Sequence, residues 1–230
     1  MSSFFQIFFE KKLKKFIFSE KSPTFAYVNQ KCSIMTEQEI IQVNESFNKQ
    51  LQQQIAGTLP AGHVYHLGVP NDILIEAGLP NLPIEMASRR LVNKAMQENH
   101  PFNLNEIMNL VLALNNPLAI FRSATHIGSN VIMTDLKHDN KNFVVAIETN
   151  REQNKTTINS IRSIHYRNSH LHIIGWIVEG LCDYFRNDFM ESWFKIIENE
   201  LQSKPQYNSV DVRKQLISAA KIVESFISSK

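Results

Sequence analysis

The stretch that decides the fold is NVIMTDLKHDNKNFVVAIET, residues 130–149. Two runs rich in β-branched residues, 130–136 and 143–149, flank a polar segment, 137–142, that is typical of a turn. This pattern predicts two neighbouring strands. Similar runs predict a strand before them at 118–122 and a fourth at 158–165. In the fourth run Ile158, Ile161 and Ile164 recur at every third residue, a spacing that fits a regular strand poorly.

Helical patterns surround these strands. Thr36 and Glu39 have the spacing of a capping box at the start of the first helix. The expected helices span about residues 36–54, 71–78, 84–100, 103–115, 173–178, 187–201 and 210–228, and a closing strand spans 181–185. Helices followed by an antiparallel meander predict an α+β fold. We expect N-terminal helices packed on a four-stranded, mainly antiparallel sheet, with additional C-terminal helices.

The first 35 residues differ from the rest. They hold six lysines and two glutamates, a net charge of +4, which leaves −2 of the total +2 for residues 36–230. Phenylalanines lie near helical spacing between these lysines, which fits a membrane-surface helix, a poorly ordered tail, or sequence upstream of a start at Met35. We therefore expect a tail at 1–35, a helical lead-in at 36–56 and one domain at 57–230.

Composition limits the classes of function. A mildly acidic body lacks the broad basic face of a dedicated DNA-binding protein, so any nucleic-acid contact must be local. Two cysteines are too few for a disulfide framework and favour a reducing compartment. No run approaches the roughly 20 apolar residues of a transmembrane segment. Nucleotide-binding glycine loops and complete zinc-ligand patterns are missing, so we expect no cofactor and no metal.

Two places carry candidate acid–base or phosphate chemistry. His100, at a junction between two expected helices, is either a proton shuttle near neutral pH or a helix-end residue bound to the last carbonyls. In a regular strand at 158–164, Ser160 and Arg162 would share one face, and Asn159, Ile161 and Ser163 the other. Arg162 is either a phosphate ligand or a charge that protects an edge strand.

The end of the first predicted strand carries a further candidate. Ser123 follows Arg122 there. Its hydroxyl could hydrogen-bond a phosphate, or it could satisfy the backbone of a turn.

Seven short motifs occur in a characteristic order. They are Thr58–Gly68 (TLPAGHVYHLG), Leu79–Glu85 (LPNLPIE), Asn99–Phe102 (NHPF), Asn116–Phe121 (NPLAIF), Gly128–Ile132 (GSNVI), Lys141–Val145 (KNFVV) and Ile158–Arg162 (INSIR). Together they resemble the phage MuF C-terminal-type domain, which is found in large polyvalent proteins of phages and conjugative elements, notably of Bacteroidales. The resemblance covers roughly residues 57–226.

The resemblance implies a ribonuclease-like fold, that of the barnase–EndoU–colicin–RelE-like group, and a metal-independent RNA-cleaving toxin or effector. It implies a base that activates a ribose 2′-hydroxyl, an acid that protonates the leaving oxygen, and cations on the phosphate. The expected catalytic residues are His100, Arg162 and Ser160, and the expected substrate-binding residues are Asn159, Ser163, Ser123 and Arg122.

The implied partners are RNA and an immunity or host protein. The implied location is the cytoplasm of a bacterial host, reached with a phage or conjugative element. The alternative is a non-catalytic phage or mobile-element domain that binds a host or structural protein.

Overall fold

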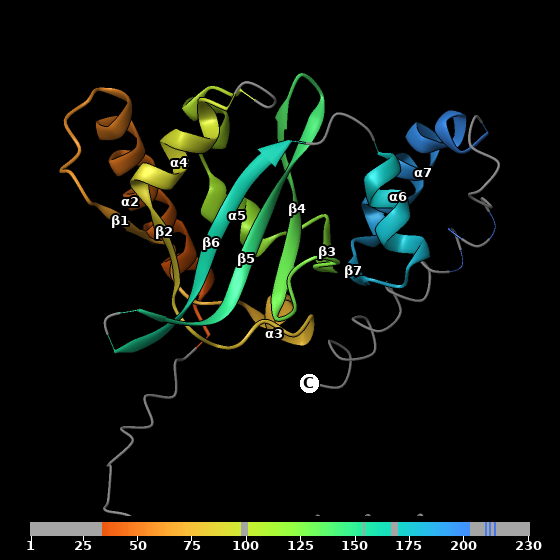
Figure 1. Cartoon of the computed structure of the whole chain (residues 1–230), viewed down its shortest axis with the longest axis horizontal. Coiled ribbons are helices and arrows are strands. Elements are labelled where there is room, and N and C mark those ends of the chain that lie inside the picture. The colour runs from red at the N-terminus through yellow and green to blue at the C-terminus, as the bar shows by residue number, and fades with distance from the viewer. Residues whose placement is uncertain are drawn as a thin grey trace, which may run out of the picture. The chain divides into compact units, whose positions relative to one another are not determined.

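A seven-stranded sheet organises the part of the chain that the structure describes (Figure 1). This structure is a computed structural model, and it describes residues 34–97, 101–153, 155–166 and 170–202 with Val210, Val212 and Lys214. The sheet order is β1-β2-β6-β5-β4-β3-β7. The strands are β1 (Val64–His66), β2 (Ile84–Ala87), β3 (Ala119–Arg122), β4 (Ser129–His138), β5 (Lys141–Gln153), β6 (Thr156–Tyr166) and β7 (Cys182–Phe185).

The predicted α+β class is confirmed, but the prediction of a four-stranded sheet is wrong. Strands β3 to β6 correspond to the four expected strands, and each pairs with its neighbour in antiparallel register. The expected closing strand is β7, which adds to the same sheet beside β3. β1 and β2 extend the other edge, where β2 pairs with β6 in parallel. Both are only three or four residues long, too short to show a periodicity in the sequence.

Part of the expected helix at 84–100 is also a strand. Ile84 and Met86 point into the core from β2, and helix α4 (Ser88–Ala95) begins directly after this strand. The change of structure at Ala87 was hidden because Ile84, Ala87 and Leu91 fit a helical face as well as they fit a strand followed by a helix.

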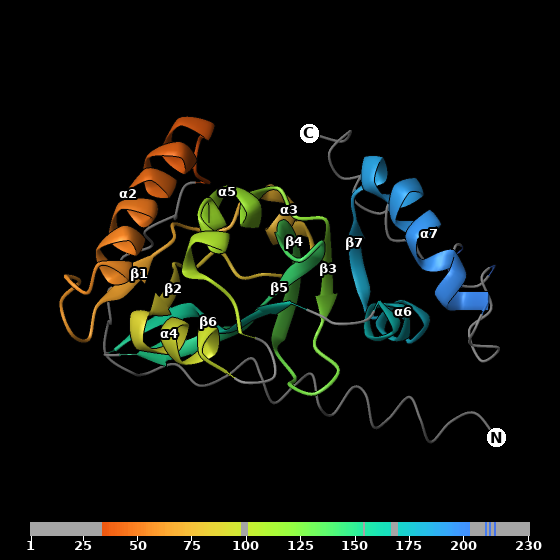
Figure 2. The same cartoon turned by 90° about the horizontal axis from the view of Figure 1, so that it is seen from above.

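One face of the sheet packs on the N-terminal helices (Figure 2). These are α2 (Glu37–Ile55), α3 (Asp72–Glu76), α4, the 3₁₀ helix η2 (Leu104–Ile107) and α5 (Leu110–Asn115). The predicted capping box of α2 is confirmed, since the Thr36 hydroxyl accepts from the Glu39 backbone N–H and the Glu39 carboxylate accepts from the Thr36 backbone. Phe47 and Leu51 of α2 then lie in the same core as Ile147 of β5.

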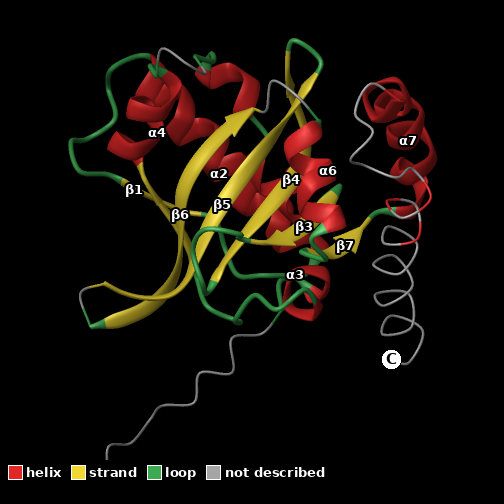
Figure 3. Ribbon diagram, turned by 45° about the vertical axis from the view of Figure 1, so that its right-hand side comes forward, coloured by secondary structure: helices red, strands yellow, loops and turns green. Residues whose placement is uncertain are grey.

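Helices α6 (Leu171–Val178) and α7 (Asn187–Gln202) come after the central strands in the chain (Figure 3). α6 precedes β7 in the sequence, and α7 follows it. They form a second core with Phe121, Met133 and Val144, whose side chains leave the sheet on the face opposite to the first core. Trp193 of α7 is fully buried in this second core. This packing covers the β3–β7 end of the second face.

A β-bulge explains the unusual isoleucine spacing in β6. Ala146 of β5 pairs with Ser163 and Ile147 pairs with Ile161, so Arg162 is an extra residue with no partner on β5. The extra residue places Ile161 and Ile164 on the same buried face although they are three apart. It also moves Ser163 to the face of Ser160, which corrects the predicted alternation.

All described residues belong to one compact unit, Cys32–Lys230. The expected tail at 1–35 lies outside the described residues except for its last two positions. No helix among the described residues is long and apolar enough to span a membrane.

Candidate functional site

The β-bulge of β6 places Arg162 at the centre of a cluster of charges. Its Nη1 lies 3.0 Å from Oε2 of Glu148, and the same oxygen lies 3.4 Å from Nη1 of Arg151. Arg162 and Glu148 are 46% and 41% exposed, so solvent and ligands reach this ion pair. An extra residue in a strand redirects a side chain, and bulges are frequent beside functional sites. We call Arg90, Glu148, Arg151 and Arg162 the arginine cluster.

The fourth member of the arginine cluster comes from helix α4. Nη1 of Arg90 donates to the carbonyl oxygen of Ile161 at 3.2 Å, next to the bulge. Burial lowers the pKa of Arg90, and repulsion by Arg162 and Arg151 lowers it further, while Glu148 raises it. Three guanidinium groups and one carboxylate therefore share this region and leave two formal positive charges on it.

A cleft of about 660 Å³ opens beside the arginine cluster. Its lining includes Arg162 and Glu148 from the sheet, and Ser123 and His126 from the loop that follows β3. Two predicted site residues far apart in the sequence, Ser123 and Arg162, are thus brought to one cleft. A cleft with a cationic wall and hydroxyl groups is suited to an anionic ligand.

Within this cleft, Ser123 also has a structural role. Its Oγ accepts the backbone N–H of His126 at 3.2 Å and that of Thr125 at 3.4 Å. The hydroxyl therefore holds the turn that follows β3, which was one of the two interpretations of this residue. Its Oγ also lies 3.5 Å from Oγ1 of Thr125, so its own proton can go either to that oxygen or to a ligand.

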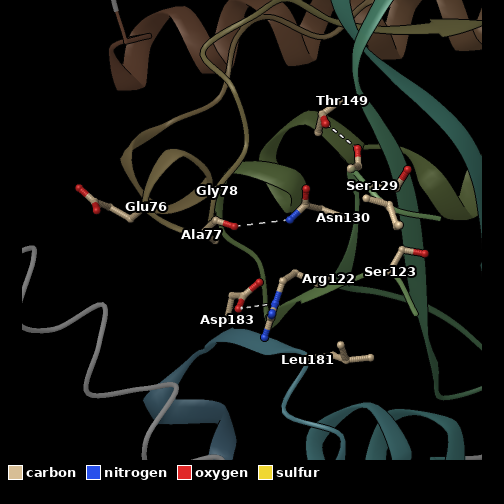
Figure 4. Close-up of a pocket in the computed structure, with 12 residues that line it drawn as sticks. Glu76, Ala77, Gly78, Arg122, Ser123, Ser129, Asn130, Thr149, Leu181 and Asp183 are labelled. Carbon is tan, nitrogen blue, oxygen red and sulfur yellow. Dashed lines mark hydrogen bonds and ion pairs between the residues drawn. The ribbon is translucent and has the colours of Figure 1, made fainter. Parts of the chain in front are cut away.

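Arg122 lies toward a neighbouring cleft of about 770 Å³ (Figure 4). Its Nε lies 3.1 Å from Oδ1 of Asp183 on β7, and its guanidinium also donates to the carbonyl oxygen of Gly180. Burial raises the pKa of Asp183, whereas the charge of Arg122 opposes that rise. Arg122 thus joins β3 to β7 and is separate from the arginine cluster.

The remaining β6 candidates differ in exposure. Asn159 is fully buried, and its Nδ2 donates to the carbonyl oxygens of Pro80 and Leu82 at 2.8 and 3.1 Å. Ser160 is 7% exposed and pairs with Glu148 across the sheet. Ser163 is half-buried, with its Oγ 3.1 Å from Nδ1 of His165. Asn159 therefore holds the loop before β2, while Ser160 and Ser163 lie on the face of the arginine cluster.

His100, the expected acid or base, lies outside the described residues. Sequence reasoning missed Glu148, Arg90 and Arg151 as members of a site. Glu148 could have been found from the alternation along β5. Ala146 and Glu148 alternate with the buried Val145 and Ile147, a pattern that places the Glu148 carboxylate on the open face of the strand. Within the described ranges, no three His, Cys, Asp or Glu side chains are placed to hold a metal ion.

The segment that carries most of this site has a family match. Residues 91–188 match the phage MuF C-terminal domain. The matched segment begins within α4, ends at the start of α7 and contains Glu148, Arg151 and Arg162 of the arginine cluster. Its similarity to the MuF C-terminal domain supports a phage-related module. No curated protein and no solved structure matches the chain.

Proposed function

We propose that this phage-related module is a metal-independent endoribonuclease that holds the scissile phosphate of RNA at the arginine cluster. The observation that carries the proposal is the convergence of three arginines from β5, β6 and α4 beside a cleft that also exposes a hydroxyl-bearing loop. Arginine binds a phosphate through two parallel hydrogen bonds, and several cations together stabilise the charge of the transition state.

Glu148 does not prevent a phosphate from binding here. An exposed ion pair contributes only about 0–1 kcal/mol, because water screens both charges. Arg162 and Glu148 are both more than one-third exposed. A phosphate can therefore replace the Glu148 carboxylate on Arg162, and it gains a bidentate contact that the single 3.0 Å contact does not provide.

The displaced carboxylate suits the chemistry of the reaction. Glu148 can accept the proton of the ribose 2′-hydroxyl as the 2′-oxygen attacks phosphorus. The bond from phosphorus to the 5′-oxygen then breaks, and the leaving oxygen takes a proton from an acid, for which His100 is the expected group. The products are a 2′,3′-cyclic phosphate and a 5′-hydroxyl, and no further reactant is required.

The proposal is tested with purified full-length protein and RNA in the presence of EDTA. Wild type should cleave RNA and should leave RNA with 2′-O-methyl groups intact. Arg162→Gln should lower kcat by about a hundredfold or more, the typical loss for one transition-state charge contact. Glu148→Gln and His100→Ala should each lower it by at least a similar factor if they transfer protons.

The matched control is Lys137→Gln. This exposed lysine on β4 lines neither the cleft beside the arginine cluster nor the cleft at Arg122, and its substitution removes one positive charge as Arg162→Gln does. Wild type without cleavage products, or full activity of Arg162→Gln, refutes the nuclease proposal. A stoichiometric complex with a host or structural protein, combined with inactivity on RNA, would instead favour the non-catalytic alternative.

A further inference from the structure

Beside the arginine cluster lies a second cleft, between helix α4 and strand β6. Its volume is about 410 Å³. Among the described residues, every charged residue that lines it is basic: Arg89, Arg90, Lys94 and Arg162. The neutral residues Asn93 and Gln97 complete its polar wall. We call this the α4 cleft.

The α4 cleft forms beside β6 at the point where the pairing of β2 with β6 ends. β2 pairs with β6 only as far as Ser160, and α4 begins immediately after β2. The helix therefore runs along β6 where the β2 pairing has ended, and Arg90 donates to the carbonyl oxygen of Ile161 there. Arg89 and Lys94 lie five residues apart on α4 and both line the cleft.

The α4 cleft is continuous with the proposed reaction site. Arg162 lines both the α4 cleft and the cleft beside Ser123. Any polymer with a phosphate on Arg162 can thus place the next units of its chain over α4. The charge is also asymmetric, since the residues that line the cleft at Arg122 include one arginine and two acidic residues, Glu76 and Asp183.

From this continuity we propose that the α4 cleft is an additional phosphate-binding subsite for single-stranded RNA, in which Arg89 and Lys94 hold phosphates adjacent to the one on Arg162. The inference rests on the proposed function for its ligand. Single-stranded nucleic acid is commonly held by a positively charged groove that follows its backbone. The subsite predicts that RNA extended over α4 binds more tightly than RNA that reaches only Arg162.

The test measures binding rather than cleavage. The probe is a single-stranded, 2′-O-methyl RNA of about ten nucleotides, followed by fluorescence anisotropy with the full-length protein at several salt concentrations. For single strands each phosphate contact contributes about 0.7 to the slope of log K against log salt. If Arg89→Gln/Lys94→Gln removes two contacts, a fourfold rise in salt should weaken wild type about sevenfold more than the double variant.

Lys49→Gln/Lys137→Gln is the matched control, because it removes two exposed positive charges from α2 and β4 that do not line the α4 cleft. The inference is supported if the control keeps the wild-type slope and the α4 variant loses affinity and slope. It is overturned if both double variants lose affinity and slope equally, or if the α4 variant binds as wild type does. Wild type that does not bind the probe at low salt also overturns it.

The proposed function is judged separately by cleavage of unmodified RNA. If wild type cleaves RNA but Arg89→Gln/Lys94→Gln binds the probe as wild type does, only the subsite proposal is refuted. Binding that depends on α4 without cleavage keeps the subsite and refutes the nuclease activity.

Discussion

Asn159→Ala separates a structural role of this residue from a role in substrate binding. The wild-type side chain is fully buried and donates two hydrogen bonds, to the carbonyl oxygens of Pro80 and Leu82. The backbone N–H of Asn159 also donates to the carbonyl oxygen of Pro83 at 2.8 Å, a bond that alanine retains. The variant therefore loses the side-chain contacts that hold the loop before β2.

The magnitude follows from these contacts. Two lost hydrogen bonds cost about 1 kcal/mol each in net terms. The Pro80 oxygen retains the N–H of Leu82 at 2.8 Å, so mainly the Leu82 oxygen is left without its donor. Alanine also removes the buried Oδ1 of Asn159, which has no hydrogen-bond partner among the described residues, and removing this unsatisfied oxygen offsets part of that penalty. We expect Asn159→Ala to lower the free energy of unfolding by about 2 kcal/mol.

The assay is urea unfolding of the full-length protein near pH 7. Asn93→Ala is the matched control, because Asn93 is exposed on α4, and a surface change of this kind should alter the free energy by less than about 0.5 kcal/mol. A loss below about 0.5 kcal/mol for Asn159→Ala would refute the reasoning. So would an intact stability combined with a loss of RNA binding, since that result would assign Asn159 directly to the substrate.

Asn159→Asp adds a pH dependence with a definite sign. A buried carboxylate that faces two carbonyl oxygens is disfavoured in its charged form, which raises its folded-state pKa above the unfolded value of about 3.9. The folded state then holds the proton more tightly, so the penalty of the variant should be small below about pH 4 and should grow as pH rises toward 7. The difference in unfolding free energy between wild type and variant, measured at both pH values, checks this sign.

Two further predictions concern the second core. Trp193→Ala should lower the free energy of unfolding, measured with urea, by about 3–5 kcal/mol. The reason is that the indole is fully buried and its ring centroid lies 5.3 Å from that of Phe185. A change below about 1 kcal/mol would contradict the packing of α7 on the sheet. Burial raises the pKa of the Cys182 thiol to about 12, and the thiolate is the form that reacts. In a Cys32→Ser variant at pH 8, Cys182 should therefore react with Ellman's reagent at least about a hundredfold more slowly in the folded protein than in the unfolded protein. Equal rates in the two states would contradict this.

Local patterns predicted elements whose stability is mainly local. The capping box of Thr36 and Glu39 is confirmed because a side chain and a backbone N–H three residues away are enough to form it. β4 and β5 were found because each carries a run rich in β-branched residues on either side of a polar turn segment. β1 and β2 were missed because their few residues form strands only by pairing with segments distant in the sequence.

The candidate site also has a part that the sequence indicated and a part that only the structure shows. The sequence indicated Arg162 and Ser123 as possible phosphate ligands, because their side chains have that chemistry in any fold. It could not show that they line one cleft, since 38 residues of strand, hairpin and turn separate them. It also could not show the bulge, because the extra residue is defined only by the register against β5.

By itself the sequence determined the α+β class, the capping box of the first helix, the central strands and the arginine suited to a phosphate, since each depends on the chemistry or spacing of nearby residues. The tertiary structure alone decided the seven-stranded sheet, the buried position of Asn159, the gathering of Arg90, Arg151 and Glu148 around Arg162, and the α4 cleft. These features depend on which distant segments pair and in which register, and a shift of one residue turns a strand side chain from one face of the sheet to the other.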